Sequence, residues 1–221
     1  PDIAALSGNP MDQDGDGIVG EADEDLYAAG FQIADVIYLA DMQADPGWTF
    51  TPGSQWEYGE PAGQGGALYG LPDPVGGYSG SRAVGVNLSG DYGTAVGGPY
   101  HAATGAIDCR GFENVELTYY RWLNTDQGLY VTATVEVSND EQTWTSVYEN
   151  PANEDVTDAD WQFEQYDISA VADDQPTVYV RWGYEVSDSA AWPYSGWNID
   201  DVRLVGQRSG SRVVGRSVFY N

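Results

Sequence analysis

The chain has 221 residues, of which 35 are Asp or Glu and eight are Arg, with no Lys, so its formal net charge at pH 7 is −27. This composition excludes nucleic acid as a partner and predicts repulsion from anionic membranes, because both require basic side chains. No run approaches the roughly 20 apolar residues that a membrane-spanning helix needs, so we expect no membrane span.

The first predicted element is a calcium loop, DQDGDGIVGEAD, at residues 12–23. Its oxygen-bearing side chains alternate, and Gly17 allows the sharp turn that brings such oxygens around one Ca²⁺. A helix is expected to follow over about residues 21–30. The alternative is an acidic turn that holds no ion. The expected ligands are the side chains of Asp12, Asp14, Asp16 and Asp23 and the main-chain carbonyl of Ile18.

Asp at the twelfth loop position and the following EADEDLYAAG resemble a type I dockerin repeat. Dockerins carry two such loops, whereas this sequence has one D-x-D-x-D-G run. Cohesin docking therefore does not follow from the resemblance. We expect the single loop to act as a stapled linker or an interdomain clamp.

Short alternating runs between Gly, Pro, Asn and Asp turns predict strands along the rest of the chain. In the run 129–138, four small or β-branched apolar residues alternate with polar ones. This period of two predicts an all-β, antiparallel β-sandwich. We divide the chain into a calcium-loop segment (1–34), the sandwich (35–206) and a strand-like tail or linker (207–221). The lone Cys109 permits no internal disulfide and is expected to be buried.

Five segments, in order, resemble a group of secreted bacterial jelly-roll domains related to the MAM and proprotein-convertase-P groups. Such domains accompany immune-inhibitor-A-type peptidases and surface proteins. The resemblance implies a jelly-roll fold and secretion, but it does not imply one activity. The segments are ADMQADPGWT (40–49), QWEYGEPAGQGG (55–66), SGSRAVGVNLSGDY (79–92), TATVEVSNDEQTWTSVY (132–148) and SGWNIDDVRLVG (195–206).

The same resemblance implies a second Ca²⁺ site between the first and last strands. Asp200 and Asp201 are adjacent and should point to opposite faces of a strand. One would reach the ion, with Asp41 as co-ligand, and the other would cap a neighbouring loop. The alternative is that these carboxylates face solvent.

Two predicted strands repeat an Arg-Trp pair, Arg121-Trp122 and Arg181-Trp182. If the strands are neighbours, the Trp pair forms either an exposed sugar platform or part of the core with the arginines paired to carboxylates on the other face. The expected ligand-binding residues are Trp192, Tyr194 and Trp197, because aromatic residues in the loop SAAWPYSGWN are harder to bury.

Catalysis is not expected, because the only histidine, His101, has no marked partner and no G-x-S-x-G or H-E-x-x-H motif occurs. We expect an extracellular or cell-surface, calcium-stabilised module for adhesion or glycan binding, excised from a longer protein. Its partner would be a polysaccharide or another surface protein. Two alternatives stay open: a filament subunit that self-assembles by strand exchange through its tail, and an accessory domain of a secreted hydrolase.

Overall fold

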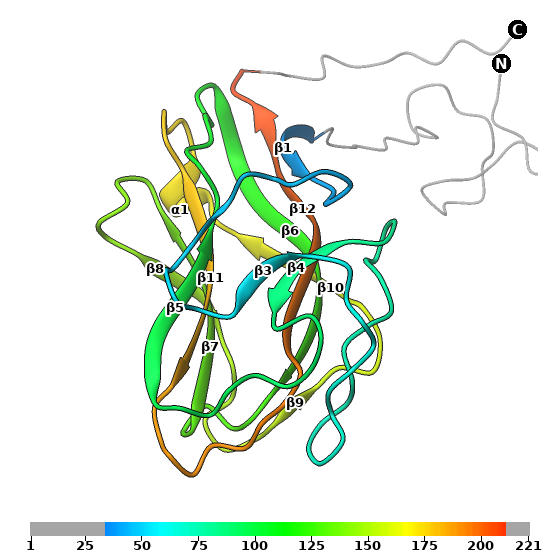
Figure 1. Cartoon of the computed structure of the whole chain (residues 1–221). Coiled ribbons are helices and arrows are strands. Elements are labelled where there is room, and N and C mark those ends of the chain that lie inside the picture. The colour runs from blue at the N-terminus through cyan, green and yellow to red at the C-terminus, as the bar shows by residue number, and fades with distance from the viewer. Residues whose placement is uncertain (1–33, 211–221) are drawn as a thin grey trace, which may run out of the picture. The chain divides into compact units, whose positions relative to one another are not determined.

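The computed structural model describes residues 34–210, so the predicted calcium loop and the tail from residue 211 lie outside the described residues (Figure 1). The described part consists almost entirely of strands. These are β1 (Asp35–Ala40), β2 (Thr49–Phe50), β3 (Trp56–Gly59), β4 (Ala83–Val86), β5 (Gly97–Ala103), β6 (Phe112–Thr125), β7 (Val131–Ser138), β8 (Thr145–Glu149), β9 (Val156–Thr157), β10 (Gln162–Asp167), β11 (Tyr179–Val186) and β12 (Gly196–Arg208), with one short helix, α1 (Ser169–Ala172).

Two antiparallel sheets face each other, as Figure 1 shows. The seven-stranded sheet has the order β10-β6-β12-β4-β3, with β1 paired to β12 and β9 paired to β6. The five-stranded sheet has the order β2-β5-β11-β7-β8. The predicted all-β, antiparallel jelly-roll sandwich is therefore confirmed for the described residues.

The core lies between the sheets and follows the alternation that the sequence predicts. On β7 the side chains of Val131, Ala133, Val135 and Val137 are buried, and Thr132, Thr134 and Glu136 alternate with them on the outer face. Burial of such side chains is the main term that stabilises a sandwich, at roughly 25 cal/mol for each Å² of apolar surface removed from water.

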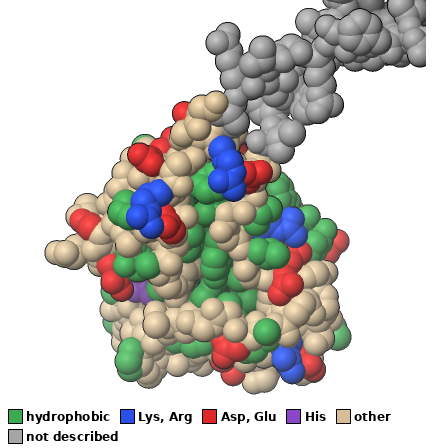
Figure 2. Space-filling view, turned by 90° about the horizontal axis from the view of Figure 1, so that it is seen from above, with side chains coloured by type: hydrophobic (Ala, Val, Ile, Leu, Met, Phe, Trp, Pro, Cys, Tyr) green, Lys and Arg blue, Asp and Glu red, His purple; other side chains and the backbone are tan. Residues whose placement is uncertain are grey.

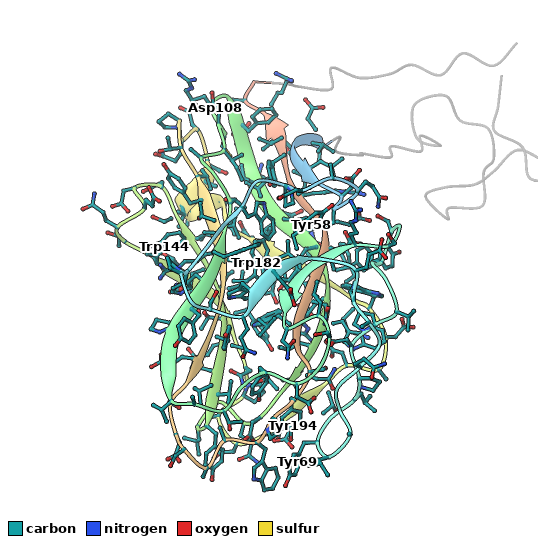
Figure 3. The ribbon with its side chains drawn as sticks, viewed as in Figure 1. Tyr58, Tyr69, Asp108, Trp144, Trp182 and Tyr194 are labelled. Carbon is teal, nitrogen blue, oxygen red and sulfur yellow. The ribbon has the colours of Figure 1, made fainter. Side chains whose placement is uncertain are left out.

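Large aromatic rings fill the middle of this core. Trp182 is fully buried and stacks on Trp48 with ring centroids 4.9 Å apart. Tyr119 meets the same ring edge-on at 5.4 Å. Figure 3 shows Trp182 between the two sheets, so the face of β11 that carries Trp182 points into the core. Alternate β11 residues must then face outward.

The long strand β12 has two neighbours on one edge, β4 near its start and β1 near its end. Between them the register shifts at Asp200–Arg203, and Asp201 takes a positive φ of 49°. The strand continues to Arg208, whose Nε lies 2.7 Å from an Asp35 carboxylate oxygen on β1.

The strand β10 stops at Asp167, and the short helix α1 follows at Ser169. Asp173 accepts hydrogen bonds from the main-chain N–H groups of Asn114 and Val115, which holds the end of this helical turn against β6. Cys109 is buried as predicted, and burial raises the pKa of its thiol to about 11. Within residues 34–210 no helix has the length and hydropathy to cross a membrane.

Candidate functional site

A groove lies on the outer face of the five-stranded sheet. Its volume is about 270 Å³, slightly below the range of ordinary small-molecule sites. The groove combines the aromatic ring of Trp144 with hydroxyl, imidazole, carboxylate and guanidinium groups, whereas the Phe50 ring packs toward the core beside the buried Ala102. Its lining residues are Thr49, Phe50, Thr51, His101, Ala103, Glu141, Trp144 and Arg181.

Three charged or polar side chains form a row across the strands at this groove. Arg181 Nε lies 2.8 Å from Glu136 Oε2, and His101 Nε2 lies 3.5 Å from the same oxygen. The hydrogen bonds from His101 and then Arg181 lower the pKa of Glu136 to about 2, against the effect of burial. Glu136 therefore stays ionised and fixes the orientation of both partners.

Gly183 makes this row possible, because it pairs with His101 on β5 and with Thr134 on β7. An added Cβ there would lie 2.7 Å from Thr134 Oγ1 and 2.9 Å from His101 Cδ2. A side chain at this position would displace His101, so glycine keeps the floor of the row open.

Trp144 stands at the side of the groove, on the turn before β8 (Figure 3). The guanidinium carbon of Arg181 lies 3.8 Å from the centroid of the Trp144 ring. This cation–π contact holds the ring and the guanidinium together as one wall.

His101 was expected to have no marked partner. In the structure β5 and β7 both pair with β11, which brings His101 close to Glu136. The Arg-Trp repeat also differs from both predicted arrangements, because β6 and β11 belong to different sheets. Trp182 is buried in the core, whereas Trp122 is partly exposed and donates its Nε1–H to the Pro72 carbonyl at 3.1 Å.

Of the three predicted ligand-binding residues in the 192–197 loop, only Trp192 is exposed, at 48%. It stacks on Tyr69 with centroids 4.3 Å apart. Tyr194 is buried and donates its hydroxyl to Asp155, and Trp197 is buried and donates to the Gly183 carbonyl. A sugar platform needs an open ring face, so the prediction is wrong for Tyr194 and Trp197.

A second aromatic surface, which was not predicted from the sequence, lies on the outer face of the seven-stranded sheet. The rings contact one another across β6, β10 and the 60–82 loop, the segment between β3 and β4. Phe163 and Tyr78 are 56% and 46% exposed. The alternation of residues along β6 could have predicted this surface, since Tyr120 and Trp122 occupy the face opposite the buried Tyr119 and Leu123. We call the set the aromatic ledge: Tyr78, Tyr120, Trp122, Trp161 and Phe163.

Of the three carboxylates predicted for a second metal site, Asp200 and Asp201 contact the 60–82 loop at Ser79. Asp200 is fully buried, and its Oδ2 accepts a hydrogen bond from the Ser79 main-chain N–H at 2.9 Å. An ideal Cβ on Gly77 would lie 2.6 Å from Asp200 Oδ2, 2.7 Å from the Ser79 carbonyl oxygen, and close to the Arg82 carbonyl oxygen. Because Gly77 has no side chain, these three oxygens can lie close together around one point. We call this arrangement the oxygen cradle.

Burial is the main cause that raises the pKa of Asp200 to about 7, and the charge of Asp201 adds to it. Asp201 Oδ1 accepts from the Ser79 hydroxyl at 3.1 Å. Both carboxylates therefore contact Ser79, whereas the sequence predicted that they would point to opposite faces of the strand. The positive φ of Asp201 interrupts the alternation of the strand at this point.

The Asp41 side chain does not reach the cradle. It is exposed, and its Oδ1 accepts from the Gln43 main-chain N–H at 3.1 Å. The side-chain amide of Gln43 also donates to the main-chain carbonyls of Asp41 and Ser79. Among the described residues no three His, Cys, Asp or Glu side chains converge as a metal site, so a cation at the cradle would rely on main-chain carbonyls.

The arginines of the described part each have an acidic partner, and Figure 2 shows blue side chains beside red ones on the face seen from above. Within residues 34–210 the positive side chains are therefore paired with acids, and they form no extended basic surface.

Comparison with protein-family models gives no match, and no curated protein sequence matches this chain significantly. Solved structures are similar in fold only. The K1 cleaved adhesin domain of Lys-gingipain from Porphyromonas gingivalis W83 aligns over 82% of this chain and all of its own length, with 15% identity and a TM-score of 0.48. The CBM22-1 xylan-binding domain of Paenibacillus barcinonensis Xyn10C aligns over 81% of this chain and all of its own length, with 12% identity and a TM-score of 0.46. TmCBM61, solved with β-1,4-galactotriose, aligns over 73% of this chain and 89% of its own length, with 11% identity and a TM-score of 0.44.

Proposed function

We propose that this protein is a non-catalytic carbohydrate-binding module and that the groove on the five-stranded sheet is its ligand site. The observation that supports this proposal is the joining of an aromatic wall to a fixed polar row. Trp144 supplies the wall, and Arg181, which is held by Glu136, supplies the row.

This combination matches the chemistry of a sugar ring. A pyranose has an apolar C–H face, which stacks on an aromatic ring, and an equatorial rim of hydroxyls. Each hydroxyl both donates and accepts, so it pairs with a carboxylate on one side and a guanidinium on the other. Because Arg181 gives only its Nε–H to Glu136 at 2.8 Å, its remaining N–H groups are available to the ligand.

The salt-bridged row also favours a neutral glycan. Arg181 offsets the charge of Glu136, and Glu141 adds a further carboxylate at the rim. The chain as a whole carries −27, so a polyanionic glycan would be repelled at long range. Neutral polysaccharides face no such penalty.

The test is retention of the protein on a panel of neutral polysaccharides, followed by calorimetry with the oligosaccharide that binds. Trp144→Ala should weaken binding at least tenfold, because removal of a stacked aromatic ring at the centre of a site typically costs about 2 kcal/mol or more. Arg181→Gln should weaken binding to a similar degree and leave the sheet folded.

Trp161→Ala is the matched control, because it removes a ring of the same kind from the aromatic ledge on the other sheet. Equal loss of binding in Trp144→Ala and Trp161→Ala would remove the groove as the site. Absence of binding by the parent protein across the panel would remove the proposal itself.

We further propose that the module is extracellular and belongs with the MAM-like and proprotein-convertase-P-like jelly rolls. We also propose that Ca²⁺ bound at the oxygen cradle fastens the 60–82 loop to β12. The buried Asp200 carboxylate and the converging carbonyls of Ser79 and Arg82 support the calcium site. A Ca²⁺ ion there would supply positive charge to a carboxylate that otherwise lacks it.

A further inference from the structure

A second buried carboxylate, Asp73, belongs to the 60–82 loop itself and contacts β12 at Asn198, away from the oxygen cradle. It is 2% exposed, and its Oδ1 accepts a hydrogen bond of 2.7 Å from Asn198 Nδ2 on β12. Both remaining oxygens of this pair, Asp73 Oδ2 and Asn198 Oδ1, are buried and have no hydrogen-bond donor. Two unsatisfied acceptors in one contact are costly, at about 1–3 kcal/mol each.

A single proton satisfies both acceptors. An ionised carboxylate and an amide oxygen only accept, whereas a carboxylic acid also donates one O–H. With the proton on Asp73 Oδ2, that O–H donates to Asn198 Oδ1 while Asn198 Nδ2 donates to Asp73 Oδ1. Reversing the amide of Asn198 does not help, because it would set two acceptors against each other at 2.7 Å.

The charges around this pair also favour the neutral acid. Glu57 on β3 and Asp91 on the turn after β4 both act on Asp73, and both are acidic. Glu57 accepts from the Leu88 N–H and Asp91 from the Gly66 N–H, so their carboxylates are held in place. On β12, the nearest acidic side chain along the strand is Asp200, two residues from Asn198. The arginines of the described part pair with other acids.

The pair also sits where the 60–82 loop is fastened to the sheet. Three consecutive loop residues make the attachment. Leu71 N–H donates to Asn124 Oδ1, the Leu71 carbonyl accepts from the Ser195 hydroxyl, and the Pro72 carbonyl accepts from Trp122 Nε1. Asp73 completes this row through Asn198. The protonation of Asp73 therefore bears on how firmly the loop is held.

We propose that Asp73 and Asn198 form a protonated acid–amide latch that ties the 60–82 loop to β12 and loosens as the pH rises. Burial, followed by the charges of Asp91 and Glu57, raises the pKa of Asp73 to about 7 in the folded protein, although the Asn198 hydrogen bond lowers it. The ordinary Asp value is about 3.9. Because the folded value is the higher one, the latch contributes fully below about pH 4 and its contribution is lost as the pH rises to about 7.

The direct test is a ¹³C NMR titration of the Asp73 side-chain carboxyl. The expected midpoint is about 7, well above those of the exposed aspartates. Asp91→Asn should lower that midpoint, because it removes one neighbouring negative charge. An Asp73 carboxyl that is already ionised at pH 5 overturns the proposal.

The second test is hydrogen–deuterium exchange of the 60–82 loop. Every protein in this comparison carries Asp200→Asn, because Asp200 titrates in the same range. With Asp73 intact, the equilibrium constant for opening of the loop, obtained from the exchange rates, should rise about tenfold per pH unit between pH 5 and 7, or roughly 100-fold in all. Asp73→Asn rebuilds the two-bond ring with an amide and needs no proton, so its opening constant should stay level.

Equal pH dependence with and without Asp73→Asn overturns the latch. Glu149→Gln serves as the charge-matched control, because it removes an exposed carboxylate on β8 and should leave the loop's pH dependence unchanged. Neither test uses glycan binding, so failure of the groove proposal leaves this inference intact.

Discussion

At the scale of single residues, Gly77 offers the sharpest test of the oxygen cradle. Gly77→Ala would insert a methyl group among the oxygens of Asp200, Ser79 and Arg82. We expect about 1–3 kcal/mol of destabilisation from overpacking. We also expect Ca²⁺ to raise the melting temperature of this variant less than that of the parent, because only the loop at residues 12–23 would still bind the ion; scanning calorimetry with and without Ca²⁺ measures this.

Gly105→Ala is the matched control, because an added Cβ there meets nothing within 4 Å and its φ is not positive. It should keep the full calcium response of the parent. If Gly77→Ala keeps that response as well, Ca²⁺ does not bind at the cradle.

The sequence pointed to this place but not to its ligands. The adjacent Asp200 and Asp201 of the closing strand were visible as a motif, and Asp200 does lie buried beneath the loop. The carbonyls of Ser79 and Arg82 were not predictable, because main-chain oxygens leave no trace in residue type. The exclusion of the Asp41 side chain depends on a short turn in which it accepts from Gln43 N–H.

At the scale of strands and loops, Arg121 joins three elements. From β6 its Nε lies 2.9 Å from Asp158 Oδ2, after β9, and its Nη1 lies 3.0 Å from Glu164 Oε1, on β10. All three side chains are less than 20% exposed. Arg121→Ala would leave two largely buried carboxylates without their cation. We expect a loss of about 3–5 kcal/mol in the free energy of unfolding, measured by urea denaturation.

The Arg110–Asp108 pair provides the comparison, since both side chains are more than half exposed. Arg110→Ala should leave the free energy of unfolding almost unchanged, because solvent screens an exposed ion pair. Similar losses for the two variants would mean that the Arg121 cluster does not stabilise the edge of the sheet.

The strands themselves were easier to predict than the order in which they pair within each sheet. Alternation alone identified β7, because its inward residues are small and apolar at every second position. It did not reveal that β6 and β11, each with Arg followed by Trp, lie in different sheets. Consequently the groove was missed, since its row requires β5, β11 and β7 to be neighbours in that order. Pairing depends on residues far apart in sequence, and local pattern does not report it.

At the scale of the whole molecule, the net charge of −27 governs stability as well as partners. Self-repulsion among so many carboxylates destabilises a compact chain unless cations screen or bind them. The described arginines are each paired with an acid, and at the groove the pairing fixes the orientation of Arg181. Ca²⁺ bound at the predicted loop and at the proposed cradle would add further positive charge.

The calcium loop at residues 12–23 yields the last prediction, and it lies outside the described residues. Alternating Asp12, Asp14 and Asp16, followed by Gly17, should bind one ion. With the oxygen cradle, the parent chain should bind two Ca²⁺ by isothermal calorimetry. Asp14→Ala with Asp16→Ala should reduce the count to one, and added Gly77→Ala should reduce it to none. Chelation should lower the melting temperature of the parent, since an ion present at 100 times its Kd stabilises the folded state by about 2.7 kcal/mol. An unchanged count in the Asp14/Asp16 double variant would show that the loop holds no ion.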